Sequence, residues 1–63
     1  MNSNAGGSIL RLAQVLVITG LSKSTIYAMV TAGTFPRQVR LGKRSVGWQA
    51  GQVFDWVALR PQA

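Results

Sequence analysis

The segment Gly20-Leu21-Ser22 constrains the fold most, because it separates two apolar patterns of helical spacing. Before it, four residues follow the i, i+3, i+4, i+7 spacing of one helix face: Leu12, Val15, Leu16 and Thr19. This spacing predicts a helix over residues 11–19, with Gly20 as its C-cap. Ser22 is a preferred N-cap for a second helix. Two short helices joined by a tight turn that contains glycine are typical of a helix-turn-helix.

The β-branched run over residues 15–19 makes a strand the rival interpretation of the first segment. The glycine cap, with Leu21 as its accompanying hydrophobic contact, favours the helix. The second helix is expected over residues 23–32, because Gly33 is a suitable C-cap and Pro36 blocks continuation.

The second helix has two contrasting faces on a helical wheel. One face is apolar and comprises Ile26, Met29 and Val30. The other has no acid and no bulky aliphatic side chain, and comprises Lys23, Ser24, Tyr27, Ala28 and Thr31. Such a face suits a helix that enters the major groove of DNA. An ordinary amphipathic helix with a solvated face would show the same pattern.

After Pro36 the hydrophobic period changes from that of a helix to that of a strand. Val39 and Leu41 alternate with polar residues, Gly42-Lys43-Arg44 supplies a turn, and Val46 and Trp48 alternate again. This pattern predicts a β-hairpin over residues 37–48 with one apolar face.

A last helix is expected over residues 50–59, with Val53, Trp56 and Val57 on its apolar face. Phe54 falls off that face, either as a tolerated exposed residue or as a contact for a second protomer or another protein.

The order of elements predicts a mainly helical domain with a small β-hairpin, a winged helix-turn-helix in which the hairpin is the wing. We expect a disordered leader over residues 1–9, the domain over residues 10–60 and a tail over residues 61–63. The predicted core combines the apolar positions of all elements: Leu12, Val15, Leu16, Leu21, Ile26, Met29, Val30, Val39, Leu41, Val46, Trp48, Val53, Trp56 and Val57.

The amino-acid composition argues against several classes of function. The chain has no cysteine, no histidine and one acidic residue, Asp55. We therefore expect no disulfide, metal site, cofactor, small-molecule substrate or enzymatic activity. Seven Lys and Arg residues give a net charge of +6, which indicates a polyanionic partner. No apolar run approaches the length of a membrane span, so we expect a cytoplasmic protein with no membrane partner.

Residues 10–59 resemble the AlpA family of phage and prophage regulators, which is related to the excisionases and the MerR-type winged helices. The resemblance lies in LRLAQVLVITGLSKSTIY (10–27), GTFPRQVRLGKRSVGW (33–48) and VFDWV (53–57). It implies that the helix opened by LSKST is the recognition helix and that the wing contacts the flanking groove or backbone.

Two departures from the family are clear. Members usually carry acids in the last helix, where this chain has Ala50, Gln52 and Phe54. Ala28 stands where a basic residue often follows the tyrosine. Base readout would then be weaker, or would use an apolar contact with a thymine methyl.

We therefore expect double-stranded DNA to contact Lys23, Ser24, Thr25, Tyr27, Ala28, Arg37, Arg40, Lys43 and Arg44. Two alternatives stay open: Thr25 could serve mainly the first helical turn, and the Tyr27 ring could pack on the wing. Arg11 and Arg60 lack such a context and are expected to be solvated.

The expected function is sequence-specific transcriptional regulation of phage or prophage type. The alternatives are an excisionase-like recombination factor, which would use the same contacts, and a small phage effector that binds a host protein. Since one recognition helix covers few base pairs, we expect a homodimer or a cooperative multimer on DNA.

Overall fold

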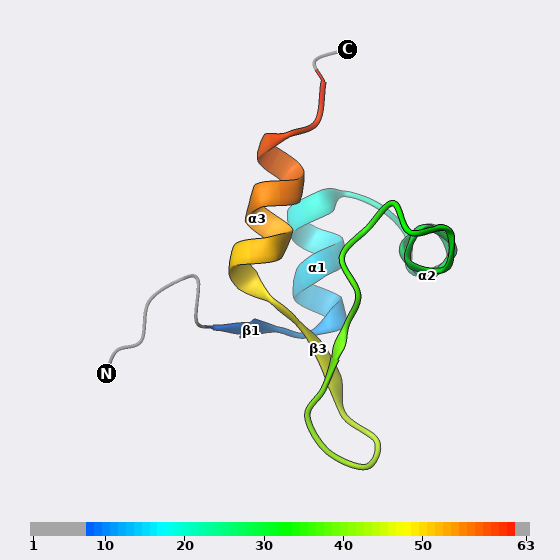
Figure 1. The fold of residues 1–63 in the computed structure, drawn as a ribbon, viewed down its shortest axis with the longest axis vertical. Helices are drawn as coiled ribbons and strands as arrows, with labels where there is room; N and C mark the ends of the chain where they lie inside the picture. Colours follow the sequence, from blue (N-terminus) through cyan, green and yellow to red (C-terminus); the bar gives the residue numbers. More distant parts are fainter. Residues whose placement is uncertain (1–7, 62–63) are drawn as a thin grey trace.

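The computed structural model describes residues 8–61, which form three helices and a three-stranded sheet. The elements follow in the order β1 (Ile9–Leu10), α1 (Leu12–Thr19), α2 (Lys23–Ala32), β2 (Val39–Arg40), β3 (Val46–Gln49) and α3 (Ala50–Ala58). α1 and α3 stand next to each other, α2 lies to one side, and the β2–β3 hairpin projects beyond the helices (Figure 1). This is a winged helix-turn-helix, as the sequence predicts.

The turn between α1 and α2 has the capping geometry expected from its sequence. Gly20 adopts φ 75° and donates its backbone N–H to the Leu16 carbonyl at 2.8 Å. Ser22 Oγ accepts the Thr25 backbone N–H at 3.2 Å. The two helices therefore meet at a bend of 93°. α2 has the predicted bounds, and α1 begins one residue late because Arg11 is its N-cap.

The sheet has the order β1-β3-β2, and both pairings are antiparallel. β1 was not predicted, and Ile9 was expected to belong to the leader; instead, Ile9 pairs with Gln49 and Leu10 pairs with Trp48. The Ser8 carbonyl also accepts the Ala50 N–H at 2.8 Å, so the ordered backbone begins before residue 10. Residues 1–7 and 62–63, which hold the rest of the predicted leader and the end of the tail, lie outside the described residues.

The prediction of one apolar face on the hairpin is wrong. Val39 pairs with Gly47 and Arg40 pairs with Val46. Because directly paired residues project to the same side of a sheet, Arg40 shares the face of Val46, whereas Val39 shares the face of Gly47. The turn sets this register through the Leu41 N–H, which donates to the Ser45 carbonyl at 2.7 Å.

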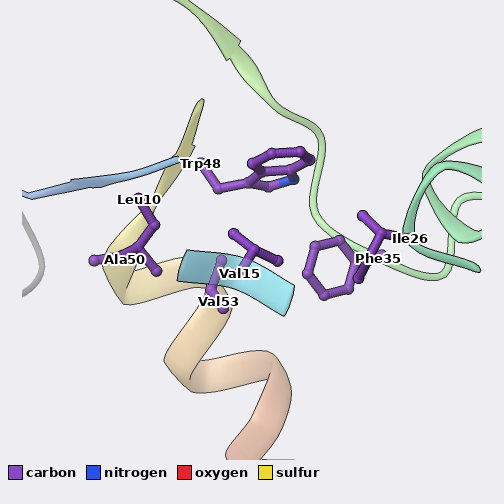
Figure 2. Close-up of a cluster of buried hydrophobic side chains, with 7 residues drawn as sticks. All are labelled: Leu10, Val15, Ile26, Phe35, Trp48, Ala50 and Val53. Atoms are coloured by element: carbon purple, nitrogen blue, oxygen red, sulfur yellow. The ribbon is translucent and has the colours of Figure 1, made fainter. Parts of the chain in front are cut away.

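The core lies where the sheet meets the three helices (Figure 2). Its buried members are Leu10, Val15, Ile26, Phe35, Trp48, Ala50 and Val53. Trp48 is the largest fully buried side chain, and its Nε1 donates to the Pro36 carbonyl at 2.8 Å. Phe35 packs edge-on against Trp48 and Trp56, with ring centroids 6.4 and 4.8 Å apart.

The predicted core is confirmed in its centre and wrong at two positions. Val15, Ile26, Trp48 and Val53 are fully buried, and most of the other predicted members are half-buried. Leu41 is 44% exposed because the hairpin extends beyond the helices, and Val57 is 36% exposed. The prediction also omitted three buried residues: Leu10, Phe35 and Ala50.

Among the described residues, no single helix is long and apolar enough to cross a membrane. Only α1 and α2 taken together, across their 93° bend, reach that length and hydropathy.

Substitution of Gly47 tests the packing of the sheet. A Cβ atom at Gly47 would lie 2.5 Å from Ile9 Cγ2, 2.9 Å from the Leu10 carbonyl oxygen and 3.2 Å from Leu41 Cδ1. Because the Leu10 backbone cannot retreat without disturbing its pairing with Trp48, Gly47→Ala is expected to lower the free energy of unfolding by about 1–3 kcal/mol. Urea denaturation followed by circular dichroism measures this loss.

Gly42→Ala is the matched control, because a Cβ there meets no atom within 4 Å. It should change the free energy of unfolding by about 0.5 kcal/mol or less. Equal losses in the two variants would contradict the packing described for Gly47.

Candidate nucleic-acid interface

The exposed face of α2 is made of short side chains opposite its buried face. Ser24, Ala28 and Thr31 are exposed, whereas Ile26 on the opposite side is fully buried. Their i, i+4, i+7 spacing aligns the three residues on one stripe. Thr31 was not among the residues expected to contact DNA, although the same helical spacing already placed it on this face.

The start of α2 combines capping groups with one cation. Lys23 is the first helical residue and is exposed. The Ser22 hydroxyl donates to Thr25 Oγ1 at 2.9 Å and accepts the Thr25 N–H at 3.2 Å. Through these hydrogen bonds Thr25 stabilises the first turn of α2, which is one of the two roles that the sequence left open for it. Its exposed side chain remains beside Ser24 and Lys23 on the surface.

Tyr27 is half-buried and packs against the base of the wing. Its ring centroid lies 6.4 Å from that of Trp48, with the ring planes tilted by 54°. The alternative that placed this ring on the wing is the one that the structure adopts. The contact holds α2 against β3, so the side of α2 that carries Tyr27 is the side that faces the hairpin.

The hairpin carries the densest group of cations. Arg40, Lys43 and Arg44 lie in it and are exposed, and the exposed Arg37 lies in the segment that leads into β2. Arg40 lies on β2, and Lys43 and Arg44 lie in the turn that projects furthest from the helices (Figure 1). Asp55, the one acid of the sequence, belongs to α3. The positive charge of the wing therefore faces solvent, where it can attract a polyanion.

Arg60 has a partner of its own. Its guanidinium lies 4.1 Å from the centre of the Trp56 ring, and its Nε donates to the Trp56 carbonyl at 3.0 Å. It lies just beyond α3, at the opposite end of the molecule from the hairpin (Figure 1). Arg11, at the start of α1, is exposed as expected.

A separate part of the surface is apolar. Phe54 is 45% exposed on α3, which confirms that it lies off the apolar face of that helix, and Val17 is 84% exposed on α1. A shallow hollow of about 370 Å³ is lined by Ala13, Gln14, Val17 and Ile18. No charged side chain lines it.

Comparison with known proteins agrees with this architecture. The family model described as "Prophage CP4-57 regulatory protein (AlpA)" matches residues 8–60. The chain is 35% identical over 66 aligned positions to the "DNA-binding transcriptional activator AlpA" of Escherichia coli (strain K12), an alignment that covers 95% of this chain and 94% of that protein.

A second relative comes from a phage. The chain is 45% identical over 51 residues to "Uncharacterized protein ORF88" of Enterobacteria phage P4. That alignment covers 81% of this chain and 58% of the phage protein, so the chain spans little more than half of that relative. The resemblance drawn from the three sequence stretches is thereby confirmed: the chain belongs to the AlpA family of prophage regulatory proteins.

Proposed function

We propose that this chain is a phage-type regulator that binds duplex DNA, with α2 in the major groove and the wing on the flanking backbone or minor groove. The observation that carries the proposal is the pairing of a small, acid-free helix face with a protruding hairpin that, together with the segment leading into it, holds four exposed cations. The printed name of the E. coli relative, a DNA-binding transcriptional activator, supports the same function.

The shape and chemistry of the two elements suit this mode of binding. The major groove of B-DNA is about 12 Å wide and admits an α-helix. Ser24, Ala28 and Thr31 project little from α2, so its backbone can approach the base edges closely. Lys23 and the wing cations would contact phosphates, which supply affinity and orientation rather than sequence readout.

Two functions are open to such a protein, transcriptional control and an excisionase-like role, and both would use these contacts with DNA. Transcriptional control is favoured by the name of the relative that this chain matches over most of its length. An excisionase-like role would add pronounced bending of the bound DNA. A phage effector that binds a host protein would use the exposed Phe54 and the last helix, but it would leave the cations in and beside the hairpin without a role. A DNA partner also implies a cytoplasmic protein associated with the nucleoid.

We expect more than one protomer on each DNA site, because one recognition helix reads too few base pairs for genomic specificity. Sedimentation of the protein with a duplex selected from a random DNA library measures the stoichiometry. A ratio of two or more protomers per duplex is the expected result. A single protomer that binds the selected duplex with high specificity would contradict it.

Arg44→Ala tests the assignment of the wing. Loss of one phosphate contact should weaken binding to every duplex and reduce the slope of log affinity against log salt by about 0.9. Fluorescence anisotropy with a labelled duplex at several salt concentrations measures both quantities.

Arg60→Ala is the matched control, because it removes the same charge from the opposite end of the molecule. It should leave the salt slope unchanged. If Arg44→Ala kept the affinity and the slope of the parent protein, the assignment of Arg44 at the wing tip to the DNA interface would be wrong.

A further inference from the structure

We infer that Lys23 and Arg40 bind one and the same backbone phosphate, the one on the ridge between the groove entered by α2 and the groove met by the wing. This inference rests on the proposed function and assigns one wing cation a role that the others do not share. It follows from the directions in which the two side chains leave their elements.

Arg40 leaves the hairpin on the side of the recognition helix. It is paired directly with Val46, and Val46 and Trp48 are two positions apart on β3. Paired residues and residues two apart project to one face, so Arg40 shares the face of Trp48. The Trp48 ring on that face packs against Tyr27 of α2. Arg40 thus projects into the angle between hairpin and helix, nearer to the tip than Trp48.

Lys23 leaves α2 on the side of the hairpin. It precedes Tyr27 by four residues, so the two side chains lie on the same side of the helix, one turn apart. Since Tyr27 contacts Trp48, this side of α2 is turned toward the wing. Lys23 is exposed and is therefore free to reach a group that lies between the two elements.

The two cations consequently flank one angle, whose inner end is closed by the Tyr27 and Trp48 rings. In the proposed complex, the DNA strand whose backbone separates the major groove from the minor groove runs through this angle. A phosphodiester has one negative charge and two unesterified oxygens. The planar guanidinium of Arg40 and the compact ammonium of Lys23 can each donate to one of them. Lys43 and Arg44 lie in the turn, beyond the paired strands, and are assigned to other phosphates.

The salt dependence of binding distinguishes a shared phosphate from two separate ones, since the slope counts the phosphates that the protein neutralises. The variants are Lys23→Gln, Arg40→Gln and their combination, together with Arg44→Gln and the matched pair Lys23→Gln/Arg44→Gln. All three positions are exposed, so the variants should keep the melting temperature of the parent protein. Their affinities for one labelled 20-base-pair duplex are measured between low and physiological salt.

Lys23→Gln and Arg40→Gln alone should each leave the salt slope nearly unchanged, because the other cation still neutralises the phosphate. The Lys23→Gln/Arg40→Gln pair should lower the slope by about 0.9, the value for one phosphate, and lose more affinity than the product of the two single losses. Arg44→Gln alone should lower the slope by about 0.9, and the matched pair should lower it no further, because Arg40 still neutralises the shared phosphate, so its losses should multiply. A slope reduced by about 0.9 in each of Lys23→Gln and Arg40→Gln would show two separate phosphates. If the losses of binding free energy were additive in both double variants, the shared phosphate would be overturned and the proposed function would still stand. Failure of the parent protein to bind the duplex in a salt-dependent way would overturn the proposed function itself.

Discussion

Burial of Trp48 is the interaction on which the rest of the structure depends. A domain of this size buries a modest part of its surface, and this sequence has no cysteine with which to add a disulfide. The Trp48 ring is fully buried, packs against Tyr27 and Phe35, and donates its indole N–H to the Pro36 carbonyl. One side chain thus joins the sheet, α2 and the loop between them. The relative position of α2 and the wing follows from these contacts.

The helices could be predicted because their ends are encoded locally. Gly20 and Gly33 both adopt the positive φ expected of helix C-caps, and Ser22 accepts the backbone bond expected of an N-cap. A cap and a helical period involve residues within a few positions of each other, so a single sequence reveals them. The bounds of α2 were therefore correct to the residue.

The sheet was predicted less well because its pairing depends on residues far apart in the chain. Nothing near Ile9 indicates that its partner is Gln49, so β1 was missed. The hairpin register was assumed to align its apolar residues, but the turn sets Val39 opposite Gly47 instead. Phe35 belongs to no periodic segment, and only its contacts with two tryptophans reveal it as core. For the same reason, sequence alone could not choose between the two positions considered for the Tyr27 ring.

The charges of the molecule are distributed unevenly, and this asymmetry gives the proposed function its physical basis. Lys23 lies on α2, four cations lie in the hairpin and the segment that leads into it, and the one acid lies on α3. α3 also exposes the apolar side chain of Phe54. The part of the candidate interface that sequence could predict was the set of exposed cations, because long charged side chains are seldom buried. The direction of each cation required the strand register and the Tyr27 contact.

The most direct test of the central claim is a nuclear magnetic resonance titration of the isotope-labelled protein with a short DNA duplex. Residue-specific shifts would report which surface meets the DNA. The account predicts the largest shifts at Ser24, Ala28 and Thr31 on α2 and at residues 40–44 of the wing, with little change along α3. Shifts centred on Phe54 and α3, or no shifts at near-physiological salt, would contradict it.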